Sequence, residues 1–394
     1  MKIRLSERLQ RLSPYLFLEI DKVKRKARNQ GKDIIDFGVG DPDQRTPDYI
    51  IDVLCQAARD PACHRYALDQ GMPALRRAIA DWYKRRFRVR LNPETEILPL
   101  IGSKEGIAHL PLTIINPGDY ALVPNPCYPP YRGGTILAGG RVYSLPLLES
   151  NNFLPEFNAI PNDVLKKAKL LYINYPNNPT SAIADKEFYR EVVDFARKKN
   201  IVVISDLAYS EIYFDGFRPP SFLQAKGAKA VGIEFHSLSK TYNMTGWRIG
   251  WVCGNRNLVA ALAKVKSNID SGIFSAIQIA GIAALKGSDD NITKTRRLYQ
   301  ERRDILVEGL NSLGWKIGSP KATFYIWAKI PENYSRAGKS GNSIAFARRL
   351  LKSAGIVVTP GVGFGKYGED YVRFALTVDK ERIKEAIGRL RKNL

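Results

Sequence analysis

Cysteine is scarce in this chain, which has only Cys55, Cys63, Cys127 and Cys253 among its 394 residues. The four show neither close pairing nor the spacing of a zinc site, so we expect no disulfide framework and no bound metal. The N-terminus lacks an apolar segment followed by a cleavage site, and no apolar run reaches the roughly 18 residues that a membrane span needs. These absences predict a cytoplasmic protein that does not associate with membranes.

Acidic residues are outnumbered, with 39 Asp and Glu against 61 Lys and Arg and a net charge of +22. A charge of this size attracts nucleic acid, anionic lipid or acidic metabolites. The basic residues are spread in short groups such as Lys84-Arg85-Arg86, within helix-like stretches, and no RRM, zinc-finger or helix-turn-helix pattern accompanies them. We therefore expect anionic substrates and no nucleic-acid binding, an expectation that tight, salt-sensitive DNA binding would overturn.

Internal repeats, low-complexity tracts and long linkers are also missing. Single hydrophobic cores stop growing at roughly 250–300 residues, so a chain of this length is expected to form two domains. We place an N-terminal arm and part of a small domain at 1–47, a large domain at 48–285 and the rest of the small domain at 286–394. The last boundary falls in Lys286-Gly287-Ser288-Asp289-Asp290.

In the large domain, short β-branched runs alternate with amphipathic stretches, which indicates βαβ units on a largely parallel sheet. The expected strands are Ile97–Ile101, Tyr120–Val123, Arg141–Leu145, Leu170–Asn174, Ile201–Ser205, Ile233–Ser237 and Ile249–Gly254. The C-terminal part reads as a smaller α+β domain. Its expected elements are a long charged helix over Ile292–Leu313, a helix near Ser343–Ala354, and strands at Phe324–Ile330, Ile356–Val358 and Tyr371–Leu376.

Ligands of open α/β sheets bind at the carboxyl ends of the strands, so the residues that follow each strand are the informative ones. Gly102-Ser103-Lys104-Glu105-Gly106 follows the first strand and opens a helix, which is typical of an anion site but also of a tight connection. After the strand Leu170–Asn174 comes Asn177-Asn178-Pro179-Thr180. This segment is either only a proline turn or a turn that presents an amide to a ligand. Asp206, with Tyr209 three residues on, follows a third, where an acid also serves as a helix cap.

The most specific segment is Ser237-Leu238-Ser239-Lys240, followed by Gly246-Trp247-Arg248-Ile249-Gly250. A lysine between small hydroxyl residues, with an arginine eight positions on, is unlike a chance set of solvent-exposed basic residues. Taken together, these segments resemble the fold-type I pyridoxal-phosphate enzymes of the aspartate aminotransferase superfamily, over essentially the whole chain. The resemblance implies a large α/β domain with a mostly parallel seven-stranded sheet between helices, a smaller α+β domain, and amino-group transfer with pyridoxal 5'-phosphate.

The resemblance also assigns roles in the cofactor site. Lys240 matches the lysine that holds the cofactor as a Schiff base and then moves a proton, Asp206 the partner of the pyridine nitrogen, and Tyr209 a ligand of the ring hydroxyl; these three are the expected catalytic residues. The other expected cofactor ligands are Asn178 at the ring hydroxyl, Tyr128 stacked on the ring, and Ser103, Lys104, Ser237, Ser239 and Arg248 at the phosphate.

Two further matches concern the substrate and the assembly. Arg373 matches the arginine that binds the substrate α-carboxylate, although by itself it reads as an outward residue of a small strand. Tyr66 matches a tyrosine that reaches the phosphate bound by the neighbouring subunit, which implies a homodimer with shared active sites. One position departs from the family: Ser181 follows Asn-Pro-Thr where glycine is usual, so it needs a conventional backbone or tolerated strain.

Several segments look closer to LL-diaminopimelate aminotransferases, namely Ser13-Pro14-Tyr15-Leu16-Phe17, Gly102–Gly106, Asn125-Pro126-Cys127-Tyr128-Pro129-Pro130-Tyr131 and Ser267–Phe274. This implies LL-diaminopimelate, 2-oxoglutarate and glutamate as substrates, in lysine biosynthesis. The substrate would be lined by Tyr15, Gly40, Lys104, Tyr128, Asn178 and Arg373. Aminotransferases of aspartate, alanine or aromatic amino acids share most of these residues and remain alternative functions. Two further alternatives are a carbon-sulfur β-lyase and a protein that only binds cofactor or partners.

Overall fold

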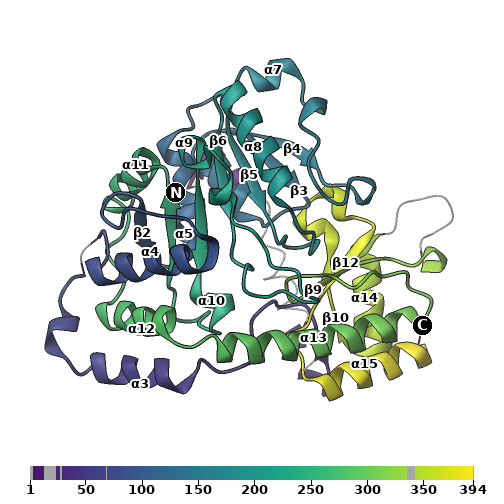
Figure 1. Ribbon diagram of the computed structural model, residues 1–394. Helices are drawn as coiled ribbons and strands as arrows, with labels where there is room; N and C mark the ends of the chain where they lie inside the picture. The colour runs from purple at the N-terminus through teal and green to yellow at the C-terminus, as the bar shows by residue number, and fades with distance from the viewer. Residues whose placement is uncertain (1–2, 13–23, 27–28, 68, 335–341, 394) are drawn as a thin grey trace.

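The computed structural model describes residues 3–12, 24–26, 29–67, 69–334 and 342–393 (Figure 1). Tyr15 and its segment Ser13–Phe17 lie outside the described residues, so the expected substrate contact of Tyr15 stays a prediction. Within the part that is described, no helix combines the length and the apolar character needed to cross a bilayer.

The large sheet has seven strands in the order β2-β8-β7-β6-β5-β3-β4. Their bounds are β2 Ile97–Leu100, β3 Tyr120–Asn125, β4 Arg141–Pro146, β5 Ala168–Asn174, β6 Val202–Asp206, β7 Gly232–Ser237 and β8 Gly250–Gly254. β8 is antiparallel to both of its neighbours, and the other pairs are parallel. The expected seven-stranded, mostly parallel sheet is confirmed, and all seven strands lie at the predicted places.

Helices cover both faces of this sheet, because its strands are apolar on both sides. Along β5, Leu171 and Ile173 join one hydrophobic cluster and Leu170 and Tyr172 join another, which is the alternation of a strand. The first cluster includes residues of α3 (Asp48–Ala57), α4 (Pro73–Phe87), α8 (Lys186–Lys199) and α12 (Ser275–Lys286). The second includes residues of α5 (Ser103–His109), α6 (Pro130–Leu137) and α11 (Arg256–Lys266).

The smaller unit is built on a three-stranded antiparallel sheet in the order β11-β12-β9. Its strands are β9 Tyr325–Lys329, β11 Thr359–Pro360 and β12 Tyr371–Ala375, with α14 (Ser343–Ala354) and α15 (Lys380–Asn393) beside them. β10 (Ile356–Val357) pairs in parallel with β1 (Ile35–Asp36), so an N-terminal segment joins the C-terminal unit. The expected helix over Ser343–Ala354 has the predicted bounds, whereas β11 was not predicted.

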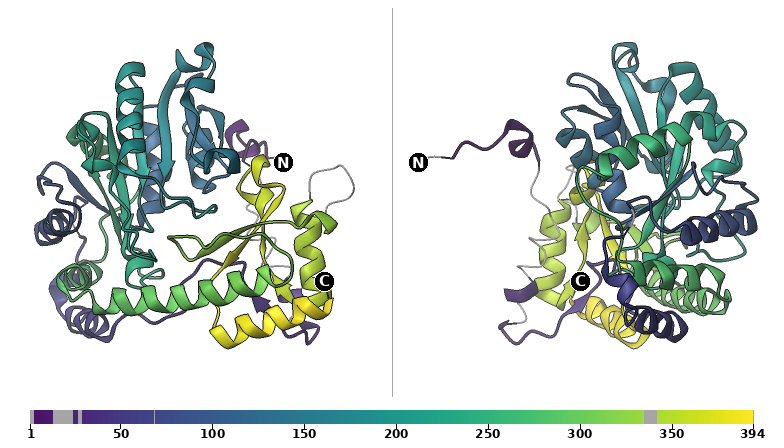
Figure 2. Two further views of the ribbon diagram at one scale, coloured as in Figure 1. Left: turned by 45° about the vertical axis from the view of Figure 1, so that its right-hand side comes forward. Right: turned by 90° about the vertical axis from the view of Figure 1, so that its left-hand side faces the viewer.

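α13 (Asp290–Asn311) is the expected long charged helix, and it runs from beneath the large sheet to α15 of the smaller unit (Figure 2). A separate hydrophobic cluster fills the smaller unit, with Phe37, Leu306, Phe374 and Leu390 among its members. The division at residues 47 and 285 stays a prediction.

The remaining described helices are short: α1 Glu7–Gln10, α7 Asn162–Leu165, α9 Ala228–Val231, α10 Leu238–Thr241, and the 3-10 turns Pro61–His64, Leu110–Thr113, Glu149–Asn151, Phe157–Ala159, Phe222–Gln224, Glu332–Tyr334, Gly361–Phe364 and Lys366–Gly368.

The topology brings the residues after several strands to one edge. Asn174 at the end of β5 pairs in register with Asp206 at the end of β6, which pairs with Phe235 of β7. Because β8 runs the opposite way, its first residue, Gly250, lies beside Ser237 at the end of β7. Arg248, just before β8, therefore reaches the same edge as the residues that follow the parallel strands.

Candidate active site

A cavity of about 330 Å³ lies at this edge and is closed on its other side by residues of the smaller unit. It is lined by ten of the expected cofactor ligands: Ser103, Lys104, Tyr128, Asn178, Asp206, Tyr209, Ser237, Ser239, Lys240 and Arg248. Of the expected substrate residues, Gly40 and Arg373 also line it. The structure thus brings these residues together, while their individual roles stay predictions.

Lys240 lies on the short helix α10, directly after β7, with its amine inside the cavity. Its Nζ donates to the carbonyl oxygen of Gly40 at 3.0 Å. Burial lowers the pKa of Lys240 to about 8; Arg373 and Arg248 act in the same direction, and Asp41 opposes them. A lysine with this pKa offers a substantial neutral fraction near physiological pH, which is the form that attacks a carbonyl or accepts a proton.

Asp206 is buried at the end of β6, and each of its carboxylate oxygens has a partner. Oδ2 accepts a hydrogen bond from the Tyr131 hydroxyl at 2.7 Å, and Oδ1 accepts from the backbone N–H of Ala208 at 3.3 Å. Burial raises the pKa of Asp206 to about 6, and the bond from Tyr131 works against that rise. No helix begins after Asp206, so the alternative reading of this acid as a helix cap is wrong.

Asn178 connects the large-domain turn to the arginine of the smaller unit. Its backbone N–H donates to Asn174 Oδ1 at 2.8 Å, and its own Oδ1 accepts from Arg373 Nη1 at 2.7 Å. Arg373 Nη2 donates to the Gly38 carbonyl at 3.1 Å, and the residue is 1% exposed. The reading of Arg373 as an outward surface residue is therefore wrong; β12 directs it into the cavity.

The other end of the cavity is suited to an anion. Gly102 has φ +74°, and a Cβ on it would lie 2.2 Å from Arg248 Nη2, so the turn lets the guanidinium approach the start of α5. The Ser237 and Ser239 hydroxyls lie 2.8 Å apart at the same place. Burial, and then the charge of Arg248, lower the pKa of Lys104. Arginine, lysine and hydroxyl groups around a glycine turn form a suitable phosphate site.

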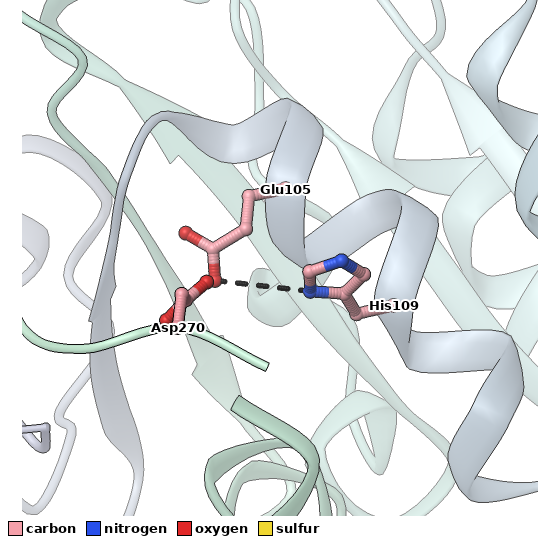
Figure 3. Close-up of side chains that lie close together, drawn as sticks. All are labelled: Glu105, His109 and Asp270. Atoms are coloured by element: carbon pink, nitrogen blue, oxygen red, sulfur yellow. Dashed lines mark ion pairs between the residues drawn. The ribbon is translucent and has the colours of Figure 1, made fainter. Parts of the chain in front are cut away.

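Beside this turn, Glu105 and Asp270 face each other, with the His109 ring next to them (Figure 3). Lys266, which is 1% exposed, donates to Glu105 Oε1 at 3.1 Å and also to the Asp270 carboxylate and the Ser271 carbonyl. Glu105 Oε2 accepts from the backbone N–H of Ile101 at 2.6 Å. The cluster therefore connects the turn before α5 to the segment after α11 through a buried ammonium.

The sequence did not single out two aromatic residues that belong to this site. Tyr131 lies one helical turn beyond Tyr128, and that spacing in the Tyr-Pro-Pro-Tyr segment was an available signal. Tyr325, on β9, donates to or accepts from the Tyr209 hydroxyl at 3.0 Å, and its ring lies 4.1 Å from the Arg373 guanidinium. Tyr66 lies elsewhere: it is 96% exposed and does not line the cavity.

Comparison with known proteins agrees with the resemblance to aminotransferases. The profile described as aminotransferase class I and II matches residues 32–390. The chain belongs to this family. A similar curated relative is the LL-diaminopimelate aminotransferase of Moorella thermoacetica, 56% identical over 99% of this chain and 98% of its own length.

Solved structures of other aminotransferases and related proteins superpose on this one. The substrate-bound BacF structure from Bacillus subtilis has a TM-score of 0.94 and 40% identity, with 100% of this chain and 98% of that chain covered. A double mutant of Thermus thermophilus aspartate aminotransferase has a TM-score of 0.90 and 28% identity, and both chains are covered completely. The expected aspartate aminotransferase-like fold is confirmed.

Aminotransferases of class I and II use pyridoxal phosphate, which is therefore the cofactor of this one. The residues present fit that group at each of its parts. Arg248 and the three serines supply donors where the phosphate would lie, the buried Asp206 carboxylate faces the cavity for the ring nitrogen, and Lys240 lies between them for the aldehyde. The glycine at position 102 leaves room for the Arg248 guanidinium, which any side chain there would displace.

Proposed function

We propose that this aminotransferase interconverts LL-2,6-diaminopimelate and tetrahydrodipicolinate, with 2-oxoglutarate and glutamate as the second pair of substrates, in lysine biosynthesis. The observation that carries the proposal is the identity of 53–56% to LL-diaminopimelate aminotransferases along nearly the full length of both chains. The Aquifex aeolicus enzyme, at 54% over 99% of this chain, is a further example.

The charge around the cavity supports a substrate with two carboxylates. We assign Arg373, on β12, to the α-carboxylate, and Lys104, at the start of α5, lines the same cavity. Lys104 also borders a second recess of about 770 Å³, to which Arg132 and Lys366 contribute further positive charge. Both diaminopimelate and glutamate carry a second carboxylate, and we assign Lys104 to that group.

The remaining roles follow from position and chemistry. Pyridoxal phosphate, when bound, withdraws electrons from the substrate Cα. With that group bound, Lys240 would remove and return the proton at the substrate Cα, Asp206 would hold a proton at the ring nitrogen, and Tyr209 and Asn178 would hold the ring oxygen. Arg373 fixes the α-carboxylate, so that the Cα–H bond faces the Lys240 amine. Gly40 would let the backbone approach the substrate, and Tyr128 would cover the ring.

The test is a panel of amino donors with 2-oxoglutarate as acceptor. We expect LL-diaminopimelate to exceed its meso isomer, aspartate, alanine and phenylalanine in kcat/KM. A preference for aspartate would reject the lysine-pathway assignment. Pyruvate and ammonia released from cystathionine without a keto acid would instead indicate the β-lyase.

Lys104→Ala tests the second carboxylate separately. We expect KM for glutamate to rise roughly tenfold while the KM for alanine, which has no second carboxylate, changes little. Equal effects on both donors would remove the proposed role of Lys104 in binding the side-chain carboxylate.

We further propose a homodimer in the cytoplasm, in which Tyr66 reaches the cofactor phosphate of the neighbouring subunit. The support is the exposure of large apolar side chains in two segments of the large domain: Tyr66 at 96%, Ile269 at 51% and Phe274 at 43%. Exposed apolar side chains that gather in one segment, as Ile269 and Phe274 do, are typical of protein interfaces.

A further inference from the structure

Ser181 occupies a strained backbone position at the junction of the two units. It has φ +60°, a region that serine rarely adopts, at the place where the related enzymes usually have glycine. Thr323, two residues before β9, has φ +68°, which is less favourable still for a β-branched residue. Both residues are buried. Of the two expectations for Ser181, the structure shows tolerated strain.

The two strained residues contact each other through their hydroxyl groups. Ser181 Oγ lies 2.7 Å from Thr323 Oγ1 and donates to the carbonyl oxygen of Tyr325 at 2.8 Å. Since the serine hydrogen is used on that carbonyl, the Thr323 hydroxyl is the donor of the pair. The backbone N–H of Tyr325 donates to Thr323 Oγ1 at 3.0 Å and completes a closed ring of hydrogen bonds. A glycine at 181 cannot make these bonds.

Tyr325 is the residue that this ring fixes, and it touches three parts of the active site. Its hydroxyl lies 3.0 Å from that of Tyr209, and its ring lies 4.1 Å from the Arg373 guanidinium. A Cβ on Gly40 would lie 2.1 Å from its hydroxyl oxygen, so the ring also sets the path of the chain at Gly40.

We propose that the Ser181 and Thr323 hydroxyls form a latch that positions Tyr325, and through it Arg373, for the substrate α-carboxylate. Ser181 is a positioning residue in this inference, which rests on the proposed role of Arg373. The latch joins the turn that carries Asn178 to the strand that carries Tyr325. Arg373 is therefore held from two sides, by the Asn178 side chain at 2.7 Å and by the Tyr325 ring.

The experiment compares variants that separate the hydroxyl from the strain. Ser181→Ala removes the hydroxyl and keeps the strain, Ser181→Gly removes both, and Thr323→Val removes the other hydroxyl at nearly constant shape. We expect each to raise KM for glutamate roughly fivefold with kcat within about twofold and with unchanged affinity for pyridoxal phosphate. Ser181→Gly should unfold at a higher temperature than Ser181→Ala.

Two controls accompany these variants. Thr323→Ser keeps the hydroxyl and should retain the wild-type KM, and Ser353→Ala removes an exposed hydroxyl far from the latch. A second readout is hydrogen-deuterium exchange of the peptide that contains Tyr325, which should become faster in Ser181→Ala. Unchanged KM in Ser181→Ala, with or without faster exchange, would overturn the latch. Arg373→Lys distinguishes the two proposals, because an unchanged KM in that variant means that the carboxylate role itself has failed.

Discussion

Burial of the Lys240 amine has a consequence for its reactivity. Only the neutral amine attacks an aldehyde, and the pKa of Lys240 is lowered to about 8 from its ordinary value near 10.5. The neutral fraction therefore grows as pH rises, reaches one half at that lowered value and is nearly complete about one unit above it. We expect the rate at which the apoenzyme captures pyridoxal phosphate, followed by visible absorbance, to rise with a midpoint near pH 8 and not near 10.5.

Asp41 provides a direct check on that pH profile. Its charge raises the pKa of Lys240, so Asp41→Asn should move the capture profile to lower pH. Asp52→Asn, which removes an exposed carboxylate on α3, should leave the capture profile unchanged.

Lys240→Ala should capture no cofactor covalently and lose transamination while staying folded. An active, yellow variant would contradict the central role of Lys240.

Tyr131 acts on the cofactor site through Asp206. Its hydroxyl donates the bond that opposes the burial-induced rise in the pKa of Asp206, so Tyr131→Phe should raise that pKa further. A smaller ionised fraction weakens the interaction with a protonated ring nitrogen. We expect pyridoxal phosphate to bind roughly tenfold more weakly at neutral pH and kcat to fall.

Tyr172→Phe is the matched control for that prediction. The Tyr172 ring stacks on Tyr131 at 4.9 Å, so the variant removes a neighbouring hydroxyl without touching the bond to Asp206. Equal losses in both variants would show that the hydroxyl of Tyr131 acts through packing and not through the carboxylate.

At the scale of elements, the start of α5 is held by ion pairs of Lys266, the last residue of α11. Lys266→Met leaves the partly buried Glu105 and Asp270 without their ammonium, which we expect to lower the free energy of unfolding by about 2 kcal/mol. It should also weaken cofactor retention, since Glu105 holds the backbone of Ile101 just before the phosphate turn. Thermal unfolding of the apoenzyme and cofactor dissociation measure the two effects.

Two variants sharpen the interpretation of Lys266→Met. Adding Glu105→Gln removes one of the orphaned charges and should recover part of the lost stability. Lys380→Met breaks the exposed pair with Glu301 and should leave the thermal unfolding temperature almost unchanged, because solvent screens that pair. If Lys266→Met were equally mild, the cluster would contribute little to the site.

At the scale of the whole molecule, the proposed dimer predicts that active sites are shared. Tyr66→Ala and Lys240→Ala should each be inactive or nearly so as homodimers. Mixing them under conditions of subunit exchange places an intact Tyr66 opposite an intact Lys240 in one of the two sites of each hybrid. We expect the hybrid to regain up to half of the wild-type activity per dimer.

Transamination activity is measured on purified hybrid dimers whose two subunits carry different affinity tags. Activity no greater than the sum of the parent variants would reject the sharing of Tyr66, and a monomer by light scattering would reject the dimer. Lys240→Ala mixed with wild type is the control for exchange itself, because it supplies one intact site whatever the role of Tyr66.

The sequence alone determined the architecture of the large sheet and which ten of the predicted cofactor residues line one cavity. Strand periodicity placed all seven strands of the large sheet, and the residues after β2, β5, β6 and β7 converge because carboxyl ends of parallel strands share an edge. Local motifs sufficed for the ten expected ligands that line the cavity, since each lies in or within a few residues of a strand, whereas Tyr66 does not and lies elsewhere.

Only the tertiary structure decided the contacts between distant segments. The inward direction of Arg373 and the place of Tyr325 depend on how the smaller unit packs on the large sheet. The bond of Tyr131 to Asp206 depends on how α6 packs on that sheet. Ser181 shows the reason most clearly. Its backbone strain is local, but the hydroxyl bonds that make serine useful there reach Thr323 and Tyr325, more than 140 positions away for each pair.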